Sequence, residues 1–306
     1  MKFMRLSGVL LLQVLIVGLF AVGCGTKNDN DDDSNIDKLS IGVVSYGEGA
    51  NSLSKYEQFK DYIANKTKKI VELEPAYNEL QAVAQVQRKT WEIVFAPPGL
   101  AAIAIASSQY KPIFSMEGVS STQRSLILVR DDKPYQKIGD LANRVIALGE
   151  NGSAAAFYVP LYDLYGMTLA QIKSAPTPKV ALTWLSDGTV EAIAISESDF
   201  ETTKREFSQT KFRVLHTSRW IPAGVVLASP NLDRNLLSVI QKSMREAPPD
   251  IVADAGYVPA AKIPNYEQFI KLVEKVRPFE EKVKQTPVVL VQPTPPVTTQ
   301  INQQTK

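Results

Sequence analysis

Short apolar runs alternate with segments of helical periodicity along most of this chain. The apolar runs predict β-strands at residues 39–45, 70–73, 93–95, 112–115, 125–129, 145–148, 192–195, 212–215 and 224–228. Helical spacing of the apolar residues between them predicts helices at residues 53–65, 80–89, 100–106, 154–165, 180–185, 200–207, 231–245 and 266–284. Continuous apolar strands that alternate with helices are typical of parallel sheets covered on both faces, so the sequence predicts an α/β fold.

The segment before the first predicted strand has the layout of an export signal. Lys2 and Arg5 precede a long apolar run, whose end is flanked by small residues. Cys24 follows the run and resembles the acylated cysteine of bacterial lipoproteins, with Ala21 at the position usually occupied by leucine. We therefore expect residues 1–23 to be a lipoprotein signal peptide and Cys24 to be lipidated. The alternative is a retained transmembrane anchor, because the apolar run is nearly long enough to span a bilayer.

Two low-complexity segments flank the predicted globular part. Residues 24–37 are rich in Asp and Asn, and they cannot bury enough apolar surface to offset the entropy of ordering. This composition predicts a flexible acidic linker with a reach of roughly 20 Å. Residues 285–306 are rich in proline and predict an extended or disordered tail. Within that tail, the apolar run at residues 288–291 could instead pack as an edge strand.

The composition excludes several classes of function. The chain carries 34 basic and 32 acidic residues, and removal of a leader with two basic residues makes the numbers equal. Such a balance argues against nucleic-acid binding, which requires a basic footprint. His216 is the only histidine, which argues against a histidine-based metal site and against a Ser-His-Asp triad. We therefore expect no metal, no cofactor and no enzymatic activity.

Three junctions between a predicted strand and the following helix could bind a ligand. They lie at residues 44–47, 95–99 and 147–153. Ligands of parallel α/β sheets bind outside the carboxyl ends of the strands, where helix N-termini offer unpaired N–H groups that suit anions. The alternative is that Ser153 or Asn151 serves only as an N-cap.

The order of the segments resembles the phosphonate- and phosphite-binding proteins of ABC transporters, which have the type II periplasmic binding protein fold. The similar stretches are LSIGVVSYGEG, KYEQFKDYIANKTKKIVEL, WEIVFAPPGLAAIA, ALGENGSAAAFYVP, WLSDGTVEAIAIS and SRWIPAGVVLASPNLDRNL. The fourth of these resembles the Ser-Thr-Ser-Gly-Tyr phosphonate-binding turn of the family. The resemblance implies two α/β lobes with parallel-rich sheets, a hinge of two segments and a ligand between the lobes.

The chain departs from the family pattern at ligand-binding positions. Ser153 keeps the first hydroxyl of the phosphonate-binding turn, while Ala154 and Ala155 replace the next two hydroxyl residues. Ala101 stands near the position of a family tyrosine. The acidic binding residue of the family falls on Ser196, next to Glu197, and the acid of the preceding strand is Glu191. The resemblance therefore implies an inherited scaffold with fewer ligand-coordinating side chains.

The resemblance also implies the domain organisation. The first lobe is expected to comprise residues 38–120 and 217–284, and the second lobe residues 121–216. The candidate ligand-binding residues at the three junctions and on the Ser196 strand are Ser45, Tyr46, Pro98, Gly99, Asn151, Gly152, Ser153, Ala154, Ala155, Ser196 and Glu197.

Two functional hypotheses follow from these observations. The first is an exported, lipid-anchored, monomeric solute-binding protein, facing the periplasm or the cell exterior. It would capture a small anion such as phosphonate, phosphite or phosphate for an ABC permease and ATPase. The second hypothesis is a degenerate homologue that acts as a sensor or partner-binding lipoprotein without a role in transport. The alanine pair at residues 154 and 155 favours the second hypothesis, since it removes hydroxyl donors.

Overall fold

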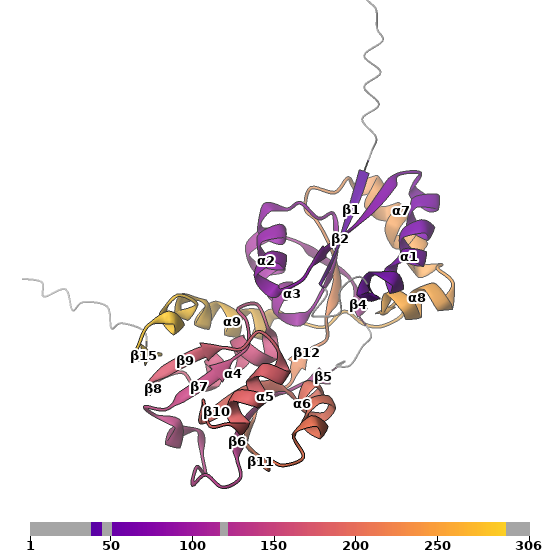
Figure 1. Cartoon of the computed structure of the whole chain (residues 1–306). Helices are drawn as coiled ribbons and strands as arrows, with labels where there is room; N and C mark the ends of the chain where they lie inside the picture. The colour runs from indigo at the N-terminus through magenta and orange to yellow at the C-terminus, as the bar shows by residue number, and fades with distance from the viewer. Residues whose placement is uncertain (1–37, 45–50, 117–121, 292–306) are drawn as a thin grey trace, which may run out of the picture. The chain divides into compact units, whose positions relative to one another are not determined.

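The computed structural model describes residues 38–44, 51–116 and 122–291. The described residues form two mixed α/β lobes, each of which is built on its own sheet (Figure 1). The sheet of the first lobe has six strands in the order β14-β4-β13-β3-β1-β2, and that of the second lobe has five in the order β11-β6-β10-β7-β9. The predicted α/β class, with sheets that contain parallel strands, is confirmed.

The first lobe combines a parallel core with antiparallel additions. Its strands are β1 (Lys38–Val44), β2 (Ile70–Ala76), β3 (Ile93–Ala96), β4 (Lys111–Met116), β13 (Val225–Ala228) and β14 (Tyr257–Val258). Its helices are α1 (Asn51–Thr67), α2 (Glu79–Arg88), α3 (Pro98–Ser108), α7 (Arg234–Arg245) and α8 (Pro249–Ala255). β1 pairs in parallel with β2 and β3, while β13 lies antiparallel between β3 and β4.

Helices cover both faces of the first sheet. α1, α7 and α8 lie on one side, and α2 and α3 lie on the other (Figure 1). On the α1 side, the rings of Phe59, Phe95 and Tyr257 pack edge to face. On the other side lies Trp91, which is fully buried. Continuous apolar strands are thus explained by burial on both faces.

The second lobe has a similar mixed sheet. Its strands are β6 (Ser125–Arg130), β7 (Val145–Leu148), β9 (Gln171–Ser174), β10 (Ala192–Ser196) and β11 (Phe212–Thr217). Its helical segments are η1 (Ile138–Leu141), η2 (Ala154–Tyr158), α4 (Val159–Asp163), α5 (Pro178–Ser186), α6 (Glu197–Thr203) and η3 (Lys204–Phe207). β7 is parallel to β9 and β10, whereas β6 is antiparallel to β10 and β11.

Two chain segments that connect the lobes pair with each other. β5 (Thr122–Gln123) and β12 (Ile221–Pro222) form a short antiparallel ribbon, in which Ile221 is fully buried. These segments lie near the two lobe boundaries, after residues 120 and 216, that the family resemblance implied.

The C-terminal segment crosses between the lobes a third time. It comprises α9 (Glu267–Val276), η4 (Arg277–Phe279), η5 (Lys282–Lys284) and β15 (Val288–Val289), which pairs with β8 (Thr168–Leu169) of the second lobe. α9 contacts α3 of the first lobe and α4 of the second. At the crossing, the hydroxyl of Tyr266 donates a hydrogen bond of 2.5 Å to the carbonyl of Ala223.

This course differs from the predicted assignment of residues 217–284 to the first lobe. It also differs from the predicted disordered tail over the part that the structure describes, residues 285–291, while residues 292–306 lie outside the described residues. α9 buries Phe269, Leu272 and Val276 against both lobes. Val288 and Leu290 are fully buried, so the alternative of a packed strand describes this run correctly. The proline content indicated an extended chain, but the apolar residues between the prolines gain more from burial.

Each predicted strand overlaps a strand of the structure, while several short elements were not predicted. β9 is an example, because Ile172 is its only buried residue and gives no periodic signal. α8 was missed as well, since it has seven residues and opens with Pro249. The predicted helix over residues 154–165 begins where expected, but its first turn is π-helical.

Candidate ligand-binding site

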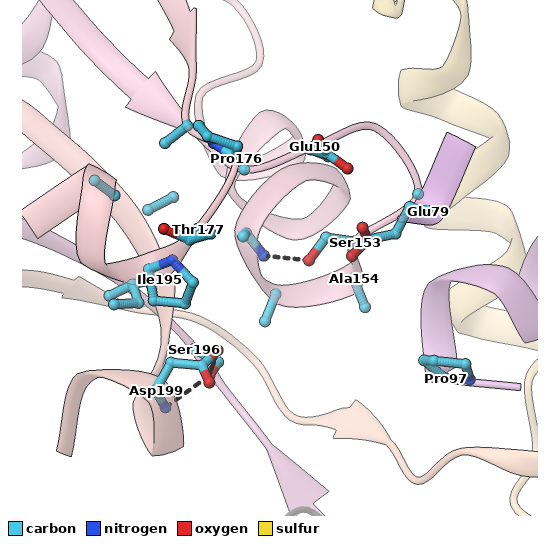
Figure 2. Close-up of a pocket in the computed structure, with 18 of the residues that line it drawn as sticks. Glu79, Pro97, Glu150, Ser153, Ala154, Pro176, Thr177, Ile195, Ser196 and Asp199 are labelled. Carbon is cyan, nitrogen blue, oxygen red and sulfur yellow. Dashed lines mark hydrogen bonds between the residues drawn. The ribbon is translucent and has the colours of Figure 1, made fainter. Parts of the chain in front are cut away.

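A cavity with a volume of about 600 Å³ is lined by both lobes. The first lobe contributes the segments at Tyr77–Glu79 and Pro97–Pro98, and the second contributes the loops that follow β7, β9 and β10. All of these segments follow the carboxyl end of a strand, where parallel sheets bind their ligands. Figure 2 shows the cavity with Glu79 and Pro97 on one side and Thr177, Ile195 and Ser196 on the other.

Four capping side chains of neighbouring helices line this cavity. Asn78, Ser153, Thr177 and Ser196 each accept a hydrogen bond from a backbone N–H three residues further on, at 2.9 to 3.2 Å. Each is the N-cap of its helix and satisfies one of the N–H groups that a helix start leaves unpaired. The N-cap interpretation of Ser153 therefore holds, and the same hydroxyl also faces the cavity (Figure 2).

The turn after Ser153 leaves two donors at the cavity. The carbonyl of Ser153 accepts from Phe157 N and Tyr158 N, and this widened turn is π-helical. The N–H groups of Ala154 and Ala155 form no hydrogen bond with any residue that the structure describes. Both residues line the cavity, at the positive end of the η2–α4 helical segment. An anionic group of a ligand would satisfy these donors.

The charged side chains that line the cavity are all acidic. Glu79, Glu150 and Asp199 line it, and no described lining residue is a lysine, arginine or histidine. Glu79 and Asp199 stand in the first turns of α2 and α6, where each carboxylate offsets the positive end of its helix. The Ser196 hydroxyl is committed as well, because it donates to Asp199 Oδ2 at 2.5 Å. The cavity therefore suits a ligand of low net negative charge better than a dianion.

The structure brings together most of the predicted residues that it describes. Pro98, Gly152, Ser153, Ala154, Ala155 and Ser196 line the cavity. Gly99 lies behind it, in direct backbone contact with Gly152. Ser45 and Tyr46 lie outside the described residues.

Two predicted residues have other roles. The carboxylate of Glu197 pairs with Arg124 at 3.3 Å, and Glu197 does not line the cavity. Asn151 Oδ1 accepts a hydrogen bond of 2.8 Å from the hydroxyl of Tyr158, which fixes the loop rather than facing the cavity. Neither position could be separated from its neighbours by sequence alone, because each is adjacent to a residue that does line the cavity.

The alanine pair is more buried than a cleft position would require. Ala154 and Ala155 are 6% and 4% exposed and belong to the same apolar cluster as Leu100 of α3. The replacement of hydroxyl residues by alanine thus coincides with packing between the two lobes. Ala101, the counterpart of the family tyrosine, is fully buried and does not line the cavity.

A polar chain connects the binding loop to the C-terminal segment. The Tyr158 hydroxyl lies 2.9 Å from Glu280 Oε1 as well as near Asn151. Burial and the Glu280 carboxylate raise the pKa of Tyr158, which therefore keeps its proton. Arg277 approaches Glu280 at 3.7 Å and donates to Ser107 Oγ of α3 at 2.8 Å. The third crossing therefore holds the loop at Asn151 and the end of α3 together.

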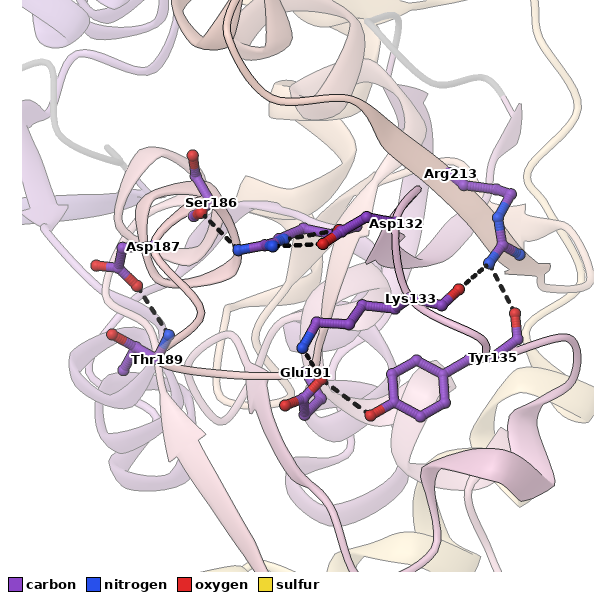
Figure 3. Close-up of polar contacts among 9 residues, drawn as sticks. Asp132, Lys133, Tyr135, Ser186, Asp187, Thr189, Glu191 and Arg213 are labelled. Carbon is purple, nitrogen blue, oxygen red and sulfur yellow. Dashed lines mark hydrogen bonds and ion pairs between the residues drawn. The ribbon is translucent and has the colours of Figure 1, made fainter.

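Glu191 lies at the opposite end of its strand from the cavity. Its carboxylate accepts from the Tyr135 hydroxyl at 2.9 Å and pairs with Lys133 at 3.3 Å (Figure 3). β10 separates it from Ser196 by five residues, which corresponds to about 16 Å. The acid that precedes this strand therefore stabilises the far end of the lobe.

Sequence reasoning missed several residues of the cavity wall. Asn78, Glu79 and Thr177 were not among the candidates, although Asn78 and Thr177 precede predicted helices and are good N-caps. A search for capping residues at every strand-to-helix junction would have found both. Glu79 carries no such signal beyond its place in a first helical turn.

Comparison with known proteins agrees with this geometry. Residues 41–271 match the family described as periplasmic phosphonate substrate-binding proteins of ABC transporters. No curated protein matches the chain.

Solved structures with the same fold have low sequence identity to this chain. XAC2383 of Xanthomonas citri, solved with bound chloride, is 16% identical, with a TM-score of 0.67 over 79% of this chain and 99% of that one. A binding protein of a Pseudomonas aeruginosa phosphonate transporter is 14% identical, with a TM-score of 0.60 over 81% and 88%. PhnD1 of Prochlorococcus marinus, in complex with methylphosphonate, is 12% identical, with a TM-score of 0.60 over 79% and 98%.

These likenesses establish the type II periplasmic binding protein fold, and the family match extends over most of both lobes. The family consists of substrate-binding proteins and not of enzymes. The chain belongs to the family of periplasmic phosphonate substrate-binding proteins of ABC transporters.

Proposed function

We propose that this protein is a lipid-anchored, monomeric solute-binding component that captures a small anion such as phosphonate, phosphite or phosphate. Binding proteins of ABC transporters bind small ligands outside the cytoplasm and work with permease and ATPase components. The observation that carries the proposal is that the N–H groups of Ala154 and Ala155 have no hydrogen-bond partner among the described residues, while both residues line a cavity between the lobes. An anion bound there would supply the acceptors. Ser153 would donate its hydroxyl hydrogen to the same group.

The affinity for simple anions is expected to be modest. Two hydroxyl donors of the family turn are replaced by alanine, and each lost charge-assisted hydrogen bond removes roughly 1.5–3 kcal/mol. The three carboxylates at the cavity reduce the affinity for a dianion further. Calorimetry with phosphite, methylphosphonate, phosphate and sulfate should therefore give dissociation constants weaker than about 1 µM.

A pair of variants tests the position of the anion in this experiment. Ser153→Ala should weaken binding further, whereas Asp233→Ala, which removes the N-cap of α7 outside the cavity, should leave the dissociation constant unchanged. Nanomolar binding of any of the four anions would contradict the expectation, and equal effects of the two variants would contradict the assignment of Ser153.

The proposed anchor is tested separately at Cys24. None of the helices within the described residues is long and apolar enough to span a bilayer. We expect the protein to fractionate with membranes, with its leader removed and an acyl mass on Cys24. The Cys24→Ser variant should lack that mass. If the variant stays in the membrane fraction and the wild-type protein carries no acyl group, a retained leader helix is the anchor instead.

A second candidate function is favoured by the same cavity. A sensor or partner-binding lipoprotein without a transport role would explain why alanine replaces two donors and why no described lining residue is cationic. The calorimetry distinguishes the two functions, because a pure partner-binding homologue should bind none of the four anions at millimolar concentration.

A further inference from the structure

One edge of the first lobe collects the starts of its parallel strands and the ends of three helices. Lys38 at the start of β1 pairs with Ile70 at the start of β2. Ile93 at the start of β3 and Lys111 at the start of β4 both pair with Ala228 of β13, so these two starts lie at the same level. α1, α2 and α3 each end directly before one of these strands. Four strand spacings separate β4 from β2, so this edge is about 19 Å wide. It is the edge opposite to the ligand cavity.

Basic residues line this edge, which we name the basic edge. Its members are Lys38, Lys66, Lys68, Lys69, Arg88, Lys89 and Lys111. Lys66, Lys68, Arg88 and Lys111 are exposed, and Lys89 is half-buried. None of these five residues forms an ion pair with another residue in the described part of the chain.

The acidic residues near the edge are already engaged. Glu72 pairs with Lys38 at 2.9 Å. The Glu92 carboxylate accepts from both the backbone N–H and the hydroxyl of Ser40, at 2.6 and 2.8 Å. Residues 24–306 contain equal numbers of basic and acidic residues, so the excess of positive charge at the basic edge is a local concentration of basic residues.

Two of the lysines occupy positions at which glycine is favoured. Lys68 follows α1 with a φ of 60°, and Lys89 caps α2 with a φ of 57°. Helices commonly end with a glycine in this left-handed conformation, because any Cβ is strained there. Gln109 at the end of α3 has the same conformation, with a φ of 63°, so this φ is common to the three helix ends at the edge, and two of the three positions hold a lysine.

The chain enters the fold at this same edge. Thirteen residues separate Cys24 from Lys38, and a random coil of thirteen residues spans roughly 20 Å. A chain anchored at Cys24 therefore holds the basic edge within one to three Debye lengths of the membrane, where charges on lipids attract it. Ile70 is 47% exposed beside Lys69, and it offers an apolar contact at the same surface.

We propose that the basic edge docks on the anionic phospholipid headgroups of the membrane to which Cys24 is anchored. The docking rests on the proposed anchor for its geometry, but the charge contact itself can be tested without lipidation. Docking at this edge would hold the first lobe against the bilayer, with the ligand cavity, at the opposite ends of the strands, open to the medium from which the ligand is captured. Delivery to a permease would then require the basic edge to leave the headgroups.

The test uses the chain from residue 24 onward with Cys24→Ser, because residues 37–306 form one compact unit. Vesicles of phosphatidylcholine alone are compared with vesicles that contain about one-third phosphatidylglycerol. We expect sedimentation with the anionic vesicles only, and loss of binding when NaCl rises from about 50 mM to about 500 mM. Lys66→Gln, Lys68→Gln and Arg88→Gln together should lower the partition coefficient at least about tenfold.

Two further variants make the outcome specific. The control changes Lys137, Lys173 and Lys211 of the second lobe to Gln, which removes the same charge but should preserve binding. The pair Lys68→Gly and Lys89→Gly should raise the melting temperature yet weaken vesicle binding, a combination that a purely structural role of these lysines does not produce.

Equal sedimentation with both vesicle types, equal losses in the edge and control variants, or no binding to anionic vesicles at low salt would each overturn the proposal. Binding of heparin without binding of the vesicles would also overturn it and would indicate a different polyanionic partner. None of these outcomes bears on the anion calorimetry or on the acylation of Cys24.

Discussion

Gly99→Ala is expected to abolish most ligand binding while the protein stays folded. A Cβ at Gly99 would lie 1.9 Å from the carbonyl oxygen of Gly152 and 2.9 Å from Ala154 N. Both neighbours are backbone atoms of the other lobe, so α3 and the binding loop must move apart by more than 1 Å. The cavity walls separate with them, and we expect the dissociation constant for phosphite or methylphosphonate to rise at least about tenfold, or about 1.4 kcal/mol.

Gly139→Ala is the matched control for this variant. A Cβ at Gly139 meets only the end of the Lys137 side chain, at 3.9 Å, and should change neither binding nor stability. Calorimetry measures the affinity, and small-angle scattering measures the radius of gyration, which should increase in Gly99→Ala even without ligand. An unchanged radius together with an unchanged dissociation constant would show that the contact between Gly99 and Gly152 is not needed for closure.

Trp91→Ala should cause the largest loss of stability among single changes in the first lobe. The indole is fully buried, and its Nε1–H donates to Glu74 Oε2 at 2.9 Å. Truncation of a buried tryptophan costs about 3–5 kcal/mol, which is a large part of the 5–15 kcal/mol that stabilises a typical domain. Urea unfolding followed by circular dichroism should therefore show a much lower midpoint.

The close packing of the Trp91 ring on β1 can also be tested by a change on the strand. Gly42 of β1 lies under the ring, and a Cβ there would come within 2.0 Å of Cδ2. Gly42→Ala should therefore destabilise the protein by about 1–3 kcal/mol through overpacking. Trp220→Ala is the matched control for Trp91→Ala. Trp220 is 57% exposed, so its truncation should lower the free energy of unfolding much less. If Gly42→Ala left the free energy of unfolding unchanged, the Trp91 ring would be free to shift, and the predicted destabilisation by overpacking would be wrong.

The sequence predicted the regular framework because buried strands are continuous apolar runs. β3 and β10 are examples, with all of their residues buried. The C-terminal crossing could not be predicted in the same way. The stripe of Phe269, Leu272 and Val276 indicates a buried helix face, but it does not indicate which lobe the face packs against. That choice depends on contacts with α3 and α4, which are far away in the sequence.

The candidate site was predicted in its position and only partly in its chemistry. The junction around Gly152 and Ser153 lies at the cavity because parallel strands bring their carboxyl ends together. The N-cap role of Ser153 was among the predicted alternatives, because the bond from Ala156 N is local. The burial of Ala154 was not predicted, because it depends on packing against the neighbouring lobe. The three acidic side chains at the cavity come from α2, from the loop after β7 and from α6, and no spacing in the sequence relates them.

The third crossing leaves the two ends of the described chain on different lobes. β1 belongs to the first sheet, while β15 pairs with β8 of the second lobe. The Lys38 side chain is 59% exposed and Val291 is 45% exposed, so both positions are open to labelling. Since Cys24 is the only cysteine, a Cys24→Ser background with cysteines at positions 38 and 291 would accept a fluorophore pair at these sites alone. Energy transfer between the two dyes would then report the opening and closing of the lobes in real time.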